Sequence, residues 1–221
     1  MPSRIAAALS ALLLLSVVSL VAAADLAIVD PAHMPLETDA VIAQLSGKRV
    51  VFVGEDHERY DQHLSQLAII RRFSEAAPGH WAIGVEYFQR SFQPYLDAYI
   101  AGSIGEHEFL TRTEYFDRWG YDFRLYRPIF QYAREQHIPM IALNAERELT
   151  DAVSKTGLAG LPPADHDRLP RGIEKPDPAY RDRLRKIFDE HPESPSADFE
   201  KFVDVQSVWD ETMGERVADR A

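Results

Sequence analysis

Three short apolar runs, each followed by a polar turn and a helical stretch, constrain the fold of this chain most strongly. The runs cover residues 49–53, 81–85 and 138–143, and they consist mainly of aliphatic residues. Runs of this length and composition are typical of buried strands. Strands that alternate with helices favour parallel βαβ units. The sequence therefore predicts an α/β fold, with a mostly parallel sheet in a three-layer α/β/α arrangement.

Helical spacing of apolar residues predicts the remaining elements. The predicted helices cover residues 38–45, 62–73, 92–100, 106–112, 125–136, 145–154, 179–188 and 199–217. The last of them runs almost to Ala221, and no strand follows it in the sequence. Because an alternating fold would continue with a strand, we expect the C-terminal part of the domain to be incomplete.

Residues 1–24 have the composition of an export signal. Arg4 is the only charged residue before Asp25, and a long apolar run between them ends in three alanines. We therefore expect residues 1–24 to be a signal peptide and residues 25–221 to form a single domain that is periplasmic or secreted. An uncleaved anchor is the alternative, because the apolar run approaches the length of a membrane-spanning helix.

The charge and the absence of cysteine exclude several classes of function. The formal net charge is −11, and an anionic domain is repelled by nucleic acid and by anionic lipid. The chain has no cysteine, which excludes disulfides, thiolate metal sites and a lipid-bearing N-terminal cysteine. We therefore expect no nucleic-acid partner and no membrane attachment after signal cleavage.

Polar residues cluster where the first two predicted strands end. Glu55 and His57 follow the first strand, His63 lies on the inner side of the next helix, and Glu86 follows the second strand. In parallel sheets the carboxyl ends of the strands border the site crevice. An imidazole beside a carboxylate could act as a base with an orienting partner, or could bind a metal. The alternative is a structural polar network without a ligand.

Aromatic residues and arginines are concentrated between residues 115 and 127. The aromatic residues are Tyr115, Phe116, Trp119, Tyr121, Phe123 and Tyr126, and the arginines among them are Arg118, Arg124 and Arg127. Rings stack on flat apolar ligands and arginines bind carboxylates, so this composition suits a pocket for a flat, apolar, anionic ligand. Aromatic residues beside helices also form ordinary core, which is the alternative.

The order and spacing of several short motifs carry a family resemblance. The motifs are Gly54-Glu55-Asp56-His57, His63, Glu86-Tyr87-Phe88-Gln89-Arg90, Gln93, Leu96-Asp97-Ala98-Tyr99, Trp119, Tyr126-Arg127-Pro128 and Asn144. Together they resemble the ChaN-like haem-binding family of the haem-binding uptake, Tiki superfamily, of which erythromycin esterase is a distant relative. The resemblance extends over residues 40–157 and again over residues 205–213.

The resemblance implies an exported protein of iron or haem uptake with an α/β/α fold. It implies a haem site with a tyrosine oxygen on the iron and basic groups at the propionates. It selects no single tyrosine, so the candidate iron ligands are Tyr87, Tyr95, Tyr99, Tyr115, Tyr121 and Tyr126. The residues expected to bind the cofactor are Glu55, His57, His63, Glu86, Gln89, Arg90, Gln93, Tyr126 and Asn144.

The chain departs from this family's pattern in two ways. Many relatives are lipoproteins, whereas this chain lacks the lipid-bearing cysteine. Relatives also continue past the last predicted helix into a strand and a glycine-histidine segment, which this chain does not contain.

Three functions follow from these observations. The first is an exported protein that binds haem or a related small molecule, and we expect binding rather than catalysis. The second is an esterase-like or metallopeptidase-like hydrolase with His57 as base and Glu55 and Glu86 as its partners, with or without a divalent metal. The third is a non-catalytic exported binding domain. In each case the domain could pair as a homodimer.

Overall fold

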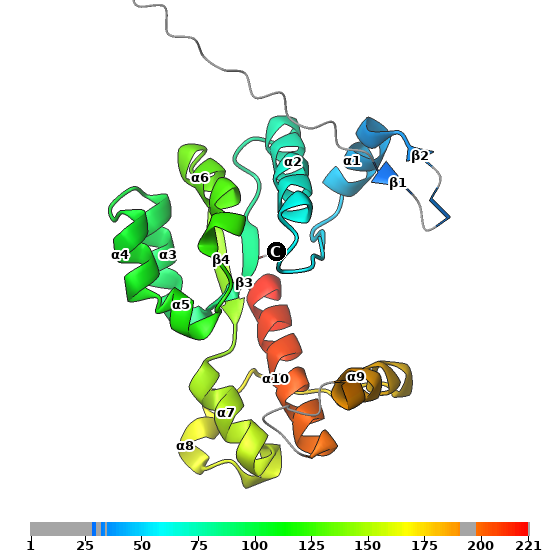
Figure 1. Ribbon diagram of the computed structural model, residues 1–221, viewed down its shortest axis with the longest axis vertical. Coiled ribbons are helices and arrows are strands. Elements are labelled where there is room, and N and C mark those ends of the chain that lie inside the picture. Colours follow the sequence, from blue (N-terminus) through cyan, green and yellow to red (C-terminus); the bar gives the residue numbers. More distant parts are fainter. Residues whose placement is uncertain (1–27, 30–31, 34, 191–197, 221) are drawn as a thin grey trace, which may run out of the picture.

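The computed structural model describes residues 28–29, 32–33, 35–190 and 198–220, so the predicted signal peptide at residues 1–24 lies outside the described residues. Its centre is a pair of parallel strands, β3 (Ile83–Gln89) and β4 (Met140–Asn144) (Figure 1). Ile83 of β3 lies opposite Met140 of β4 in the register. The predicted strands at 81–85 and 138–143 are therefore confirmed, with bounds shifted toward the C-terminus, and so is the α/β class.

Helices surround this parallel pair. They are α1 (Thr38–Ser46), α2 (Tyr60–Ala76), α3 (Gln93–Ile100), α4 (Glu106–Arg112), α5 (Tyr115–Arg118), α6 (Arg127–Glu135), α7 (Arg147–Thr156), α8 (Pro163–His166), α9 (Pro178–Glu190) and α10 (Phe199–Ala218). The single-turn elements are η1 (Arg90–Phe92), η2 (Phe123–Leu125) and η3 (Leu158–Gly160), and β1 (Ile28–Val29) pairs with β2 (Pro35–Leu36). No helix within the described ranges is long and apolar enough to span a membrane.

Local sequence signals explain where several helices begin. Pro94 and Pro128 stand in the first turns of α3 and α6, where a missing N–H is tolerated. Asp198 accepts a hydrogen bond from the backbone N–H of Glu200 at 2.9 Å and so caps α10. The helices at these positions were predicted from the helical spacing of their apolar residues, and these signals at their first turns agree with that prediction.

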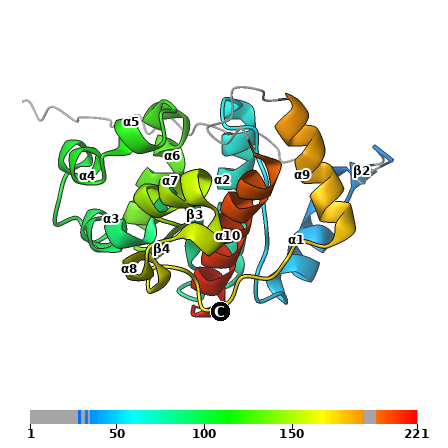
Figure 2. The same cartoon turned by 90° about the horizontal axis from the view of Figure 1, so that it is seen from below.

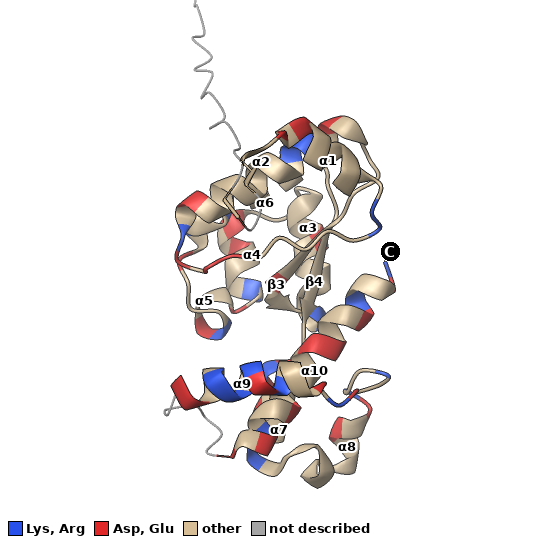
Figure 3. Cartoon of the chain, turned by 90° about the vertical axis from the view of Figure 1, so that its right-hand side faces the viewer, with Lys and Arg blue, Asp and Glu red and all other residues tan. Residues whose placement is uncertain are grey.

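The apolar core has three parts. The largest surrounds β3 and β4 and contains Phe88, Phe109 and Phe130, which are at most 1% exposed. A second joins α7 to α10, and a third joins α9 to α10. Figures 2 and 3 show α10 running between α7 and α9 and reaching up to the strand pair. The long helix α10 therefore connects α7 and α9 to the strand pair β3 and β4.

The predicted strand at residues 49–53 is wrong. These residues have no regular secondary structure, and Phe52 is 87% exposed. A strand requires a neighbouring strand for its backbone hydrogen bonds, and no described residue supplies one here. The β-branched composition was read correctly as strand-forming, but composition does not reveal whether a partner is present.

The far edge of β4 is covered by side chains. Ile83 N donates to Pro139 O, so the alternating backbone groups of Met140 and Ala142 face away from β3. Gln93 Nε2 donates to Met140 O at 2.8 Å, and Ala142 N donates to Gln93 Oε1 at 2.9 Å. Arg216 Nε also donates to Ala142 O, at 3.2 Å. The Gln93 amide thus takes the place that a further strand would occupy.

We predict that Gln93→Ala destabilises the fold by about 1–3 kcal/mol, because it leaves two part-buried backbone groups of β4 without this partner. The free energy of unfolding in urea measures the effect. Gln131→Ala, at an exposed position of α6, is the matched control and should change stability little. Equal effects of the two substitutions would contradict the assigned role of Gln93.

Candidate functional site

The buried carboxylate of Glu55 lies between two imidazoles. His57 Nδ1 is 3.0 Å from Glu55 Oε1, and His63 Nε2 is 2.7 Å from Glu55 Oε2. The side chains of Glu55 and His63 are 8% and 1% exposed, whereas that of His57 is 31% exposed. The turn after residue 53 therefore presents one histidine to solvent and holds the other inside. An imidazole oriented in this way could accept a proton from a ligand.

Aromatic rings enclose both histidines. The ring of His57 is 4.8 Å from Trp119 and 5.0 Å from Tyr121, and the ring of His63 is 4.5 Å from Tyr126. Tyr126 donates its hydroxyl proton to the backbone carbonyl of His57 at 3.4 Å and accepts from Trp119 Nε1 at 3.3 Å. Tyr126 thus joins the aromatic segment at residues 115–127 to the turn at His57, which precedes α2.

Glu86 on β3 is the remaining predicted member of the cluster. Desolvation raises the pKa of its carboxyl group; the nearby His57 opposes this shift, while Glu55 and Asp210 add to it. Glu86, which is itself an exposed residue, thus interacts electrostatically with Glu55 and His57, and its membership of a common site stays a prediction. Sequence reasoning did not identify Asp210, which accepts a hydrogen bond from the Tyr180 hydroxyl at 2.6 Å. Its only sequence signal was its place beside Trp209 in the last predicted helix.

The other predicted cofactor residues belong to separate networks. Gln89 accepts from Arg118 at 2.7 Å, Arg90 pairs with Glu146 at 3.0 Å, and Gln93 covers the edge of β4. Asn144 donates to the backbone carbonyl of Glu86 at 3.0 Å, so it joins β4 to β3 near the cluster. The structure thus brings together Glu55, His57, His63 and Tyr126, and it engages Gln89, Arg90 and Gln93 elsewhere.

The candidate tyrosines differ in their accessibility. Tyr99, Tyr115 and Tyr126 are at most 2% exposed, and desolvation raises the pKa of each. Desolvation also raises the pKa of Tyr87, whose ring lies 4.1 Å from Tyr126. Burial therefore disfavours the phenolate form of these four residues.

Tyr95 and Tyr121 remain partly exposed. Tyr95 packs beside Phe92 and under the guanidinium of Arg112, whereas Tyr121 contacts both His57 and Trp119. Tyr87 is also partly exposed and contacts Trp119 and Tyr126, so Tyr121 differs from it by the contact of its ring with His57.

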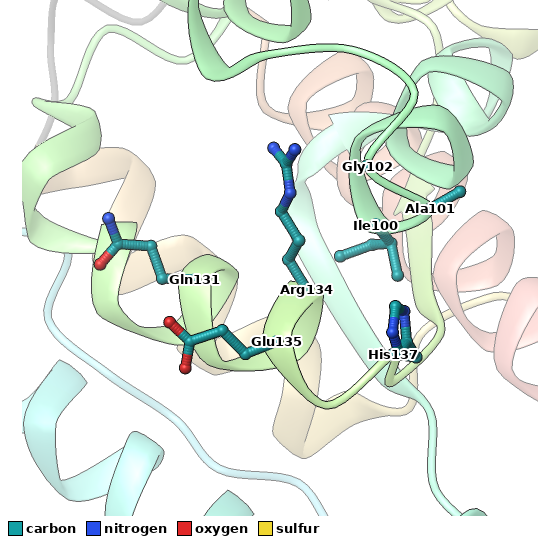
Figure 4. Close-up of a pocket in the computed structure, with 7 residues that line it drawn as sticks. All are labelled: Ile100, Ala101, Gly102, Gln131, Arg134, Glu135 and His137. Carbon is teal, nitrogen blue, oxygen red and sulfur yellow. The ribbon is translucent and has the colours of Figure 1, made fainter.

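Two surface hollows lie outside this cluster. The larger, of about 470 Å³, is lined by the end of α3 and by α6, with Gln131, Arg134, Glu135 and His137 around it (Figure 4). The smaller, of about 340 Å³, lies between α1 and α2. Neither contains a predicted site residue. The described residues also contain no group of three or more His, Asp or Glu side chains that could hold a metal ion.

The raised pKa of Glu86 predicts a pH-dependent effect of Glu86→Gln. The Glu86 carboxyl group keeps its proton to a higher pH in the folded state than in the unfolded chain. As pH rises above the ordinary pKa of 4.5, ionisation of Glu86 therefore lowers the free energy of unfolding. The variant, which is uncharged at every pH, should be more stable than the parent at neutral pH. The difference should disappear below pH 4.5, where Glu86 is protonated in both states.

Urea unfolding at neutral and acid pH measures this difference. Glu75→Gln, which removes one exposed carboxylate from the end of α2, controls for the change in net charge. A Glu86→Gln variant that is less stable than the parent at neutral pH would contradict the desolvated environment of this carboxyl group.

The comparisons with known proteins agree on one family. Residues 41–221 match the family described as "Haem-binding uptake, Tiki superfamily, ChaN". A solved structure described as "Cofacial heme binding to ChaN of Campylobacter jejuni" has a similar fold, with a TM-score of 0.66. It is 17% identical in sequence, and the likeness covers 87% of this chain and 73% of that chain. No curated protein matches the sequence.

The family match covers both predicted strands that the structure confirms, the whole histidine cluster and the long helix α10. The resemblance that the short motifs indicated is therefore confirmed over most of the chain. The chain belongs to the ChaN family of the haem-binding uptake, Tiki superfamily.

Proposed function

We propose that this chain is an exported haem-binding protein of iron or haem uptake. Membership of a haem-binding family supports the ligand. The observation that carries the proposal to this chain is the half-buried His57, whose ring lies against Trp119 and Tyr121. Exposed edges of aromatic rings beside a polar centre suit a flat apolar ligand such as haem.

We assign Tyr121 as the ligand of the haem iron. When bound, haem supplies a ferric iron that takes an anionic oxygen ligand well. The ring of Tyr121 lies against His57, whereas desolvation raises the pKa of Tyr87, Tyr99, Tyr115 and Tyr126 and so disfavours their phenolate forms. His57 is held by Glu55 and lies 5.0 Å from the Tyr121 ring, where it could receive or return the phenol proton.

The arginines of the 115–127 segment are already paired with carboxylates. Arg118 pairs with Glu114 and Glu148, and Arg127 pairs with Glu106. Arg183 differs, because its guanidinium stacks 5.3 Å from the Tyr180 ring and forms no ion pair with a described carboxylate. Tyr180 in turn bonds to Asp210, which interacts with Glu86. We therefore assign Arg183 as a partner of a haem propionate.

Titration of the purified protein with haemin tests these assignments. Haemin should give a shifted Soret band, and Tyr121→Phe should abolish the shift or move the band, because it removes the oxygen ligand. We expect the affinity of Tyr121→Phe for haemin to fall on the order of tenfold or more, that is by at least about 1.4 kcal/mol.

Two further variants separate ligation from general effects. Tyr95→Phe, at the partly exposed tyrosine away from His57, should leave both the band and the affinity unchanged. Arg183→Ala should weaken haemin binding without moving the band, because it removes a charge partner and leaves the iron ligand in place. The absence of a Soret shift in the parent would overturn the haem proposal, and a normal band in Tyr121→Phe would overturn only the ligand assignment.

Export is the second part of the proposal, and it rests on the composition of residues 1–24. N-terminal sequencing of the protein from the extracytoplasmic fraction should begin at Asp25. Leu13→Arg, which places a charge in the apolar run, should block export, whereas Ser3→Arg at the basic end should not. An intact N-terminus on protein confined to the cytoplasm would refute export.

A further inference from the structure

The larger surface hollow borders the end of the sheet where the strands begin (Figure 4). His137 lines it and stands just before β4, whereas Asn144, which bonds to the backbone of Glu86, is the last residue of β4 at the other end. All the residues that line the hollow fall between positions 100 and 137. Its volume of about 470 Å³ is within the range of small-molecule sites. The hollow is therefore a different place from the candidate haem site.

Arg134 holds its guanidinium at this hollow in a fixed position. The guanidinium carbon lies 4.8 Å from the centre of the Tyr99 ring, and Arg134 Nη1 donates to the backbone carbonyl of Ile104 at 3.2 Å. Tyr99 is 2% exposed, so the ring that supports the guanidinium belongs to the core. A guanidinium held by a stacked ring and a carbonyl loses little conformational freedom when it binds an anion.

The charge of Arg134 is not neutralised within the part of the chain that the structure describes. Arg127, about two helical turns earlier on the same face of α6, pairs with Glu106 at 2.6 Å. Arg134 has no such carboxylate among the described residues, and Figure 4 shows the side chain of its neighbour Glu135 directed away from the guanidinium. Arg134 therefore keeps charged donors for an anion from outside the chain.

The turn after α3 leaves the edge of this guanidinium open. Gly102 has a φ of +77°, and a Cβ at this position would lie 3.6 Å from Arg134 Nη2. The glycine therefore allows the left-handed turn and places no side chain against the guanidinium. Ile100 and Ala101, at the end of α3, give the hollow an apolar wall beside the charge.

His137 occupies a position at which helices usually have glycine. Its N–H donates to Arg134 O at 3.3 Å, and the N–H of Ile138 donates to Ala133 O at 2.8 Å. These two bonds form a Schellman motif at the end of α6, in which His137 is the left-handed residue, with a φ of +53°. A residue with a side chain is strained in this conformation, and such residues cluster at binding sites. The strained residue here places its imidazole in the lining of the hollow.

We propose that this hollow binds a small organic carboxylate. Arg134 holds the carboxylate through the open edge of its guanidinium, and His137 offers an imidazole N–H beside it. Ile100 and Ala101 contact the apolar part of the ligand. The apolar wall and the volume favour an organic acid over a bare inorganic anion. The proposal does not rest on haem, because none of these residues belongs to the histidine cluster.

Titration of the purified protein with benzoate, without haemin, tests the site. Benzoate carries one carboxylate on an apolar ring. In two-dimensional NMR spectra the backbone amide signals of Gly102 and His137 should shift and saturate, with a Kd on the order of 1 mM. Benzamide has the same shape without the charge, and inorganic phosphate has charge without the ring. Each should bind at least about tenfold more weakly than benzoate.

Arg134→Ala should weaken benzoate binding on the order of tenfold or more, because it removes the charged partner of the carboxylate. Arg71→Ala is the matched control. Arg71 also stacks on a tyrosine, 5.2 Å from the Tyr132 ring, but it does not line the hollow, so its loss should leave the affinity unchanged. Arg134→Ala should also keep the parental Soret band with haemin, because the two sites are separate.

His137→Gly separates binding from folding. It should weaken benzoate binding while raising the melting temperature by about 2–4 °C, because glycine relieves the strained position. Signals that do not saturate, equal binding of benzamide, or equal affinities of Arg134→Ala and Arg71→Ala would overturn the proposal. So would a His137→Gly variant that binds benzoate like the parent, or a changed Soret band in Arg134→Ala.

Discussion

The contact of the Glu55 carboxylate with two imidazoles is the interaction on which the candidate site depends. Glu55 Oε1 forms a hydrogen bond of 3.0 Å with His57 Nδ1, and Glu55 Oε2 lies 2.7 Å from His63 Nε2 without hydrogen-bond geometry. Because the side chain of Glu55 is only 8% exposed, removing His57 would leave a buried carboxyl oxygen without its hydrogen-bond partner. The backbone carbonyl of His57 in turn receives the Tyr126 hydroxyl. One carboxylate therefore ties the turn after residue 53, the start of α2 and the aromatic segment together.

The long helix α10 extends this arrangement to the lower part of the molecule. Its residues pack against both α7 and α9, and near its C-terminal end Arg216 reaches the backbone of β4. Asp210 lies between these contacts and links Tyr180 of α9 to the electrostatic environment of Glu86. The helix α10 therefore sets the position of α9 relative to the histidine cluster, because it packs against α9 and also contacts β4.

Features with local causes were predictable from sequence, and features with distant causes were not. The helices around Pro94 and Pro128 and the two confirmed strands follow from the periodicity of their apolar residues. The role of Gln93 depends on the unpaired edge of a strand 47 positions away in sequence. The tyrosine candidates separate only by burial, which spacing does not reveal.

The segment of the wrongly predicted strand brings an exposed apolar side chain and a buried carboxyl group close together in sequence. Its residues have no regular secondary structure, so individual contacts and not the alternation of a strand place their side chains. Phe52 accordingly is 87% exposed, while the Glu55 carboxylate is buried against two histidines. The hydrogen bond from Gln66 Nε2 to Val53 O, at 3.3 Å, ties the segment between these two residues to α2, the helix that also carries His63.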